Sequence, residues 1–258
     1  GGEFINFASA NASDLRPYLD QNTDTDAETL IDYILGEEQT GFRTRTIDVD
    51  GTARVWRLGD IVYSTPTVVA RPKENYDFIY SDQSYAAFES TYANRREVIY
   101  VGANDGMLHA FNGGFYDVSS HSYSDTTGHS LGEELWAYIP YNLLPHLQAL
   151  ASTEYPHVCY VDLKPKVTDA KIFSPDATHP DGWGTVLICG MRFGGGAISV
   201  TDDFGESFVI ALYQGDIYGL NAGEKMIDRA SRDAGFISDV VEADLSQWLV
   251  LNQLMCGI

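Results

Sequence analysis

Residues 56–72 read WRLGDIVYSTPTVVARP, and residues 95–111 read RREVIYVGANDGMLHAF. In the second stretch, short apolar runs flank Asn104–Asp105–Gly106, and an Asn-Asp-Gly centre is typical of a tight hairpin turn. The chain also holds 24 Gly and 16 Tyr, residues that suit turns and half-buried strand faces. This part of the sequence therefore predicts antiparallel β structure.

The same strand-turn-strand design returns twice further along the chain. Residues 186–200 read VLICGMRFGGGAISV, and residues 208–220 read FVIALYQGDIYGL around the turn Gln214–Gly215–Asp216. Shorter apolar runs at 134–140 (ELWAYIP) and 157–162 (HVCYVD) also predict strands. A repeated hairpin with strands between is typical of propeller blades, so we expect an all-β protein with a β-propeller. A β-sandwich is the alternative.

The first 50 residues differ from the rest, and we expect a helical lead-in over 1–50 and the propeller domain over 51–258. Thr25 and Glu28 have the spacing of a capping box, and apolar residues follow at helical spacing. The sequence predicts a helix from about Asp26 to Leu35, which Gly36 ends. Helical spacing also returns after Gly223.

The charge of the chain excludes some partners. With Lys+Arg 16 and Asp+Glu 37 the net charge is −21, whereas nucleic-acid surfaces need clustered Lys and Arg. The same charge disfavours anionic lipid headgroups. No apolar run approaches the roughly 20 residues of a membrane helix, so we expect no membrane span. The opening GGEFINF has neither a basic nor an apolar leader region.

Residues 56–72 and 95–111 together closely resemble the PilC/PilY-type family of type IV pilus biogenesis factors and tip adhesins, in its C-terminal β-propeller domain. The upstream LIDYILGEEQTGFRTR at 30–45 is similar to the family's approach to the propeller. Residues 134–162 and 182–202 resemble the next blades. The likeness covers roughly residues 28–203.

The resemblance implies a non-enzymatic protein, exported through the periplasm to the cell surface and associated with the pilus. It would promote pilus assembly or oppose retraction, and it would mediate attachment. The implied partners are pilin or minor pilin subunits and an external surface or host receptor. Because family members carry a large region before the propeller, we expect this chain to be the C-terminal part of a longer protein.

The length of the chain predicts an incomplete or interrupted propeller. At roughly 40–45 residues per blade, the residues after Trp56 make four or five blades at most. An open ring leaves unpaired strand edges. We therefore expect that the sequence omits native segments after about Asp203, or that another chain completes the ring.

One calcium candidate precedes the predicted helix. Asp20, Asn22, Asp24 and Asp26 alternate as oxygen ligands do in the first half of a calcium loop. Some members of the resembled family bind calcium in a propeller loop, but this segment lies ahead of the propeller and does not match that loop residue for residue. The sixth position is Thr25 rather than Gly. Helix capping by Asp24 or Thr25 explains these acids without a metal, and we favour it.

Catalytic motifs are absent from the sequence, which has no nucleophile elbow, no H-E-x-x-H and no P-loop. A quinoprotein-like propeller enzyme is one alternative, but the chain lacks the adjacent cysteine pair and the tryptophan repeats of such enzymes. A secreted scaffold propeller that binds other surface proteins is the other alternative. We expect His109 to be a satisfied core or edge histidine rather than a ligand or base.

The three cysteines, Cys159, Cys189 and Cys256, lie in apolar surroundings. We interpret them as small buried hydrophobes. A Cys159–Cys189 bridge is the alternative that an oxidising compartment would favour. The tyrosine-rich segment 113–125 (GGFYDVSSHSYSD) suits a binding loop, with a plain excursion between strands as the alternative.

Overall fold

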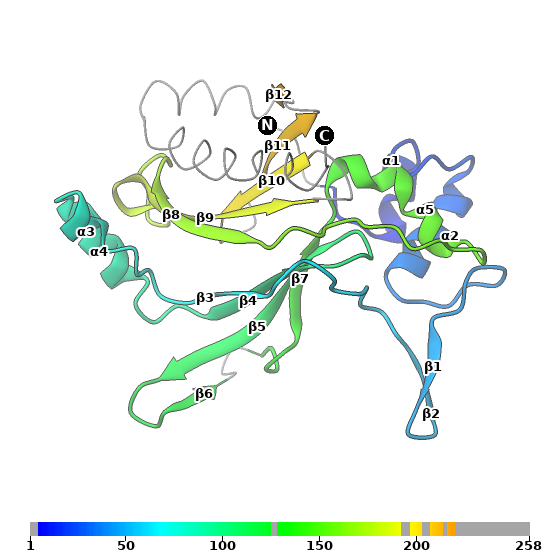
Figure 1. Ribbon diagram of the computed structural model, residues 1–258, viewed down its shortest axis with the longest axis horizontal. Coiled ribbons are helices and arrows are strands. Elements are labelled where there is room, and N and C mark those ends of the chain that lie inside the picture. Colours follow the sequence, from blue (N-terminus) through cyan, green and yellow to red (C-terminus); the bar gives the residue numbers. More distant parts are fainter. Residues whose placement is uncertain (1–4, 125–127, 192–196, 203–206, 214–215, 220–258) are drawn as a thin grey trace, which may run out of the picture.

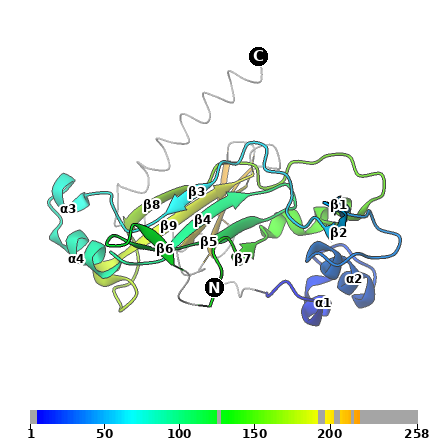
Figure 2. The ribbon, with the colours of Figure 1, turned by 90° about the horizontal axis from the view of Figure 1, so that it is seen from below.

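The structure, a computed structural model, describes residues 5–124, 128–191, 197–202, 207–213 and 216–219. Two antiparallel sheets lie side by side, and a helical lead-in sits at one end of the molecule, opposite the helix pair α3 and α4 (Figures 1 and 2). The predicted helices after Gly223 and the predicted turn at Gln214–Gly215 fall outside the described residues, as does Asp203.

The lead-in is helical, as predicted, and contains the short helices η1 (Ser9–Asn11) and α1 (Ala12–Leu15) before α2 (Asp24–Ile34). The capping box belongs to Thr23 and Asp26 rather than to the predicted pair Thr25 and Glu28. Thr23 has the extended backbone of an N-cap, and its hydroxyl accepts from the Asp26 N–H at 3.1 Å. Because the observed box lies two residues before the predicted one, α2 begins at Asp24, and Asp26 lies in its first turn instead of at its start.

A hairpin follows the lead-in, with β1 (Thr46–Val49) and β2 (Thr52–Val55) paired antiparallel. Its two central residues, Asp50 and Gly51, have φ of 52° and 79°. Positive φ at both positions is the geometry of the type I′ turns that Asp-Gly favours. The boundary predicted between residues 50 and 51 lies in this turn.

The first sheet holds four strands in the up-and-down order β3, β4, β5 and β7, and β6 pairs beside the far half of β5. Strand β5 is long enough to pair with β7 through Leu108–Phe111 and with β6 through Phe115–Asp117. The bounds are β3 (Thr67–Val69), β4 (Glu97–Gly102), β5 (Leu108–Asp117), β6 (Ser122–Ser124) and β7 (Glu134–Tyr138).

The second sheet follows chain order from edge to edge, and every neighbouring pair is antiparallel. Its strands are β8 (Lys166–Lys171), β9 (Trp183–Gly190), β10 (Ala197–Asp202), β11 (Ser207–Tyr213) and β12 (Asp216–Gly219). A short helix, η3 (Pro180–Gly182), leads into β9. The three predicted strand-turn-strand segments are therefore confirmed as the pairs β4–β5, β9–β10 and β11–β12.

The predicted all-β fold needs one correction. The described strands form two meandering sheets of the kind that make propeller blades, and they do not close into a ring, which agrees with the expected incomplete or interrupted propeller. Helices, however, interrupt the strand order, with one pair between β3 and β4 and another after β7. These are α3 (Tyr76–Ile79) and α4 (Gln83–Thr91), then η2 (Tyr141–His146) and α5 (Gln148–Ala151).

The strand predicted at residues 157–162 is wrong, because this segment has no strand pairing. Its polar groups bond to loops of the first sheet instead. The Tyr160 N–H donates to Asn104 Oδ1 at 2.9 Å, and Asp162 Oδ1 accepts from the Tyr63 N–H at 3.1 Å. The apolar run that suggested a strand instead places Tyr160 and Val161 in the core that both sheets share.

One hydrophobic core joins the lead-in, the η2–α5 segment and both sheets. Each fully buried aliphatic side chain of this kind stabilises the fold by roughly 1.5–3 kcal/mol. The core includes Leu15, Leu19, Leu30, Ile31 and Tyr33 from the lead-in, Val69, Tyr100, Leu108 and Ala110 from the first sheet, Leu143, Leu147 and Leu150 from η2–α5, and Leu187 and Cys189 from β9.

Hydrogen bonds fasten the lead-in to the end of α5. The buried Tyr33 hydroxyl lies 3.1 Å from the Leu150 carbonyl and 2.9 Å from the Arg43 carbonyl. Arg43 donates from Nε to the Leu150 carbonyl at 3.1 Å and from its backbone N–H to the Ala151 carbonyl at 2.9 Å. The lead-in is thus bonded to residues more than a hundred positions away along the chain.

The position of the capping box is testable with two threonine variants. Thr23→Ala removes the hydroxyl that caps α2, so we expect the free energy of unfolding to fall by about 1 kcal/mol. Thr25→Ala is the matched control, since this residue lies within the helix, where Ala is well tolerated. Urea denaturation of both variants measures the difference. An equal loss in both variants would contradict the assignment of the cap to Thr23.

Candidate functional site

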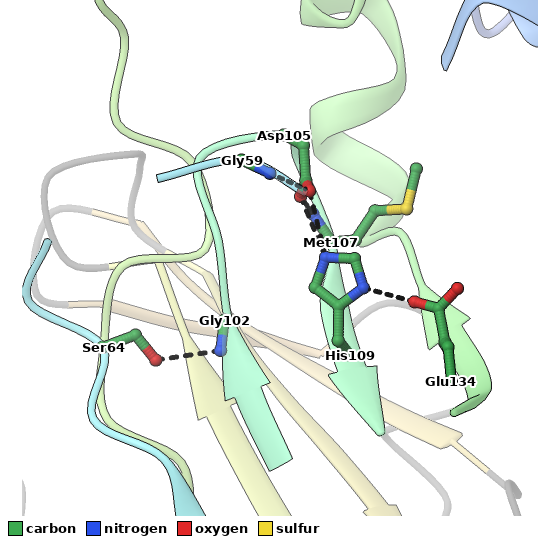
Figure 3. A network of polar contacts seen from close by, with 7 residues as sticks. All are labelled: Gly59, Ser64, Gly102, Asp105, Met107, His109 and Glu134. Carbon is green, nitrogen blue, oxygen red and sulfur yellow. Dashed lines mark hydrogen bonds and ion pairs between the residues drawn. The ribbon is translucent and has the colours of Figure 1, made fainter. Parts of the chain in front are cut away.

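The two sequence stretches that suggested the fold meet in space (Figure 3). The loop at 58–64 lies against the end of β4 and the turn between β4 and β5. Gly102 donates its N–H to Ser64 Oγ at 2.9 Å, and Gly59 donates its N–H to Asp105 Oδ2 at 2.7 Å. We call this contact the motif junction.

Asn104 and Asp60 form the second half of the motif junction. Asn104 donates from its backbone N–H to the Asp60 carbonyl and from Nδ2 to Asp60 Oδ2, both at 3.1 Å. His157 Nε2 lies 2.9 Å from the same carboxylate oxygen. Partial burial works to raise the pKa of Asp60, but the hydrogen bonds from His157 and Asn104 outweigh it and lower that pKa. Asp60 is therefore held as a carboxylate.

Two glycines allow the segments to approach so closely. A Cβ on Gly59 would lie 2.4 Å from the backbone nitrogen of Asp105, and a Cβ on Gly102 would lie 2.3 Å from the Val161 carbonyl oxygen. Both neighbours are backbone atoms, which cannot rotate away as a side chain would. Gly59 and Gly102 are thus required for the close approach of the loop at 58–64 and of Val161 to the β4–β5 segment.

His109 on β5 lies between two carboxylates (Figure 3). Its Nε2 is 3.1 Å from Asp105 Oδ2, and its Nδ1 is 2.5 Å from Glu134 Oε1 on β7. A carboxylate accepts hydrogen bonds, so both ring nitrogens donate and the ring is an imidazolium. Burial of the ring lowers the pKa of His109, but the bonds to Asp105 and Glu134 more than reverse this and raise it to about 9.

The contacts of His109 make it structural. Both nitrogens are occupied, Phe111 stacks on the ring with centroids 5.7 Å apart, and Asp105 also accepts from the Met107 N–H at 3.1 Å. Such a ring has no lone pair with which to remove a proton or bind a metal. The prediction that His109 is a structural histidine with hydrogen-bond partners is confirmed.

Of the four candidate calcium ligands, Asp20 and Asn22 precede α2, and Asp24 and Asp26 lie in its first turn. Partners within the protein engage the side chains of the last two. Asp24 Oδ1 forms an ion pair with Arg16 Nε at 2.8 Å, and Asp26 Oδ2 accepts a hydrogen bond from the Thr23 hydroxyl at 2.7 Å. Asp20 has φ of 54°. Within the described ranges, no three His, Cys, Asp or Glu side chains are grouped so that they could hold a metal. Capping therefore accounts for Asp26, and calcium binding stays a prediction.

Cys189 lies in the core as a free thiol, so the alternative Cys159–Cys189 bridge is not formed. Burial raises the pKa of the Cys189 thiol to about 12. The interpretation of this cysteine as a small buried hydrophobe is confirmed. Cys256 lies outside the described residues.

Two acidic residues of the site were missed by the sequence reasoning. Glu134, the partner of His109, is the first residue of β7, and the sequence pattern there indicates only an apolar strand. Asp162 is 1% exposed, and its Oδ2 has no hydrogen-bond partner within the structure. An acid that directly follows a buried apolar pair, as in Tyr160–Val161–Asp162, is the signal that would have found the second.

The motif junction lies inside a recognised domain. The family model described as the PilY1 beta-propeller domain matches residues 58–211. The chain belongs to the PilY1 β-propeller family. The match begins at the Leu-Gly-Asp loop and ends in β11, so it covers the junction and most of both sheets.

Named relatives of this PilY1-family chain agree with the match. It is 31% identical over 227 residues to a type IV pilus biogenesis factor PilY1 homolog of Xylella fastidiosa, covering 82% of this chain and 16% of the relative. It is 31% identical over 195 residues to type IV pilus biogenesis factor PilY1 of Pseudomonas aeruginosa, covering 72% of this chain and 14% of that protein. The chain thus matches only about a sixth of the length of these relatives.

No solved structure matches this PilY1-family chain significantly. Among the described residues, none of the helices is both long and apolar enough to cross a membrane.

The charge of His109 predicts how the stability of the PilY1-family chain depends on pH. Its pKa is raised from 6.5 to about 9, so its contribution is complete below about pH 6.5 and is lost as the pH rises through 9. We expect the free energy of unfolding to fall by up to roughly 3 kcal/mol over this interval.

Urea denaturation at pH 6, 7.5 and 9.5 measures this loss. His109→Gln should remove most of the pH dependence, whereas His157→Gln, at a half-exposed site, should retain it. A wild-type protein whose stability is flat from pH 6 to 9.5 would show that His109 is not charged.

Proposed function

We propose that this chain is the propeller part of a non-enzymatic type IV pilus factor that promotes pilus assembly or opposes retraction. The observation that supports the proposal is the motif junction, where the two stretches that resemble pilus biogenesis factors are bonded together inside the matched domain. Pilin or minor pilin subunits are the proposed partners. The proposed location is the cell surface, at the pilus, after export through the periplasm.

Two features support a non-enzymatic role. Asp105, His109 and Glu134 are bonded to one another, so these three groups stabilise a turn rather than offering a reactive group. The names of the relatives refer to pilus biogenesis and not to a reaction. Both support a protein that acts through binding surfaces.

We further propose that the hairpin β5–β6 contributes to attachment to an external surface or host receptor. Every residue from Tyr116 to Tyr123 is exposed. The rings of Tyr116 and Tyr123 lie across the hairpin with centroids 5.2 Å apart, and Asp117 Oδ1 accepts from the Ser119 N–H at 2.7 Å. Tyrosine with serine supplies a rigid, amphipathic contact area, as in antibody binding loops.

Deletion tests the proposed function. We expect a strain whose gene lacks the region encoding this chain to lose surface pili and surface attachment, measured by electron microscopy and by retention under flow. A strain with Tyr116→Ala and Tyr123→Ala should keep its pili but attach less well. Normal piliation and attachment in the deletion strain would contradict the pilus assignment and favour a free scaffold protein.

Calcium binding by Asp20, Asn22, Asp24 and Asp26 is a separate proposal, supported by the spacing of their oxygen atoms. Titration calorimetry with calcium should then show heat of binding that Asp24→Ala loses. Glu28→Ala is the matched control, since this acid lies on the same helix outside the ligand set. Identical curves for wild type and Asp24→Ala, or no heat in either, would remove this site.

A further inference from the structure

A cavity that opens to solvent lies between the helical lead-in and the end of α5. Its volume is about 340 Å³, within the roughly 300–1,000 Å³ of small-molecule sites. Residues between 21 and 42 line it from the lead-in, and residues 148–153 line it from α5 and the turn that follows. We call this space the lead-in cavity.

The walls of the lead-in cavity are held in place by the core and by long-range hydrogen bonds. Its apolar part is made by Leu30 and Ala151, which are 2% and 8% exposed. The Tyr33 hydroxyl lies 3.1 Å from the Leu150 carbonyl, and the Arg43 N–H donates to the Ala151 carbonyl at 2.9 Å. Because the two sides are fastened together, the cavity is formed before any ligand arrives, and little conformational entropy would be lost on binding.

The polar lining of the lead-in cavity is neutral. It consists of two carboxamides and two hydroxyls, from Gln21, Gln148, Ser152 and Thr153. None of the described residues around the cavity carries a charge, although the chain has 37 acidic and 16 basic side chains. Neutral hydrogen-bonding groups suit a neutral polar ligand, since a charged one would enter without a counter-charge.

Backbone contacts orient the two carboxamides. Gln21 donates from Nε2 to the Leu19 carbonyl at 2.9 Å, and Gln148 donates from Nε2 to the Pro145 carbonyl at 3.1 Å. These bonds fix which end of each amide is nitrogen, so the Oε1 atoms remain as acceptors. Acceptors held in this way match ligand hydroxyl groups, which can donate to them.

A hydroxyl donor accompanies these acceptors. Ser152 Oγ accepts from the Glu154 N–H at 3.2 Å, which leaves the proton of its own hydroxyl to donate. Ser152, Thr153 and Gln148 are all exposed, so a ligand can reach them from solvent. The cavity therefore presents both donors and acceptors, as a ligand with several hydroxyl groups requires.

An aromatic ring and an open position complete the lead-in cavity. Phe42 lines it, and its ring is held nearly perpendicular to that of Tyr33, with centroids 5.3 Å apart. A fixed aromatic ring offers apolar surface to the C–H face of a sugar ring. Beside it, Gly41 has φ of 87°, and a Cβ there would meet no described atom within 4 Å, so the cavity is open at this residue.

We propose that the lead-in cavity binds a neutral saccharide, with the hydroxyl groups of one sugar unit on the carboxamides and hydroxyls and its C–H face on Phe42. A saccharide offers both kinds of contact within the size of the cavity. A folded protein partner is a poorer fit, since such interfaces bury roughly 800 Å² per partner. Acidic sugars and phosphates are disfavoured, because no cation lines the described cavity and the chain has a net charge of −21.

Saturation-transfer difference NMR on the purified full-length protein tests the proposal. The neutral probes are the methyl glycosides of glucose, galactose, mannose and N-acetylglucosamine, and methyl glucuronide is the charged comparison. We expect saturation transfer to at least one neutral glycoside and none to the glucuronide. Absence of transfer to every neutral glycoside, or transfer of equal strength to the glucuronide, overturns the proposal.

Variants at exposed positions locate the binding. Gln148→Leu removes one oriented acceptor and should weaken the affinity for the bound glycoside about fivefold. Thr153→Trp places a large ring in the cavity and should abolish binding. The matched control is Gln83→Leu, an exposed glutamine on α4 at the opposite end of the molecule, which should bind as wild type does.

The two cavity variants should unfold at the wild-type temperature, because the side chains that they replace are exposed. Wild-type affinity in either cavity variant, or an equal loss in Gln83→Leu, overturns the proposed site. The measurement is sugar binding by the purified protein, so its outcome does not depend on the pilus assignment. Normal pili in the deletion strain would overturn the proposed function and leave the saccharide site standing.

Discussion

The hydrogen bonds of the β4–β5 turn to the loop at 58–64 are the constraint on which the rest of the structure depends. Asp105 and Asn104 reach across 46 and 44 residues of sequence to Gly59 and Asp60. A turn normally satisfies only its own backbone, but here its two side chains also fix the chain that enters the first sheet. Replacing either side chain would leave partly buried polar groups of both segments without partners.

The motif junction also places the second sheet. Asn104 Oδ1 accepts from Tyr160, so the same residue holds the segment that leads into β8. Val161 then packs on Gly102, where only a glycine leaves room for its carbonyl. From the other side, Tyr85 and Trp183 bind the helix pair of the first sheet to the second. The two sheets are thus joined at both ends of their shared boundary.

Local patterns in the sequence predicted much of the fold, because apolar runs and turn residues act over short distances. The pairs β4–β5, β9–β10 and β11–β12 and the helical lead-in follow from such patterns. The helix pair α3–α4 was missed, since its apolar stripe of Tyr85, Phe88 and Tyr92 consists of aromatics that also suit strands. The strand at 157–162 was wrongly predicted because a short apolar run that is buried in the core looks the same in sequence whether or not it pairs with a strand.

The candidate site was predictable in its residues but not in its connections. The Asn-Asp-Gly turn and the Leu-Gly-Asp loop stood out as motifs, and His109 was correctly interpreted as satisfied. Its partner Glu134 lies 25 residues away, and no local pattern encodes that pairing. The observed capping box lies two residues before the predicted one. Thr23 and Asp26 form both hydrogen bonds of the box, whereas Thr25 and Glu28 have only the matching sequence spacing.

The attachment of the lead-in to α5 has a mechanical consequence. Tyr33 and Arg43 bond to the carbonyls of Leu150 and Ala151, and these residues follow the first sheet and precede the second. A pulling force that enters through α2 therefore reaches the middle of the domain before it reaches either sheet. The load falls on several hydrogen bonds at once, and the strands stay paired until those bonds have parted.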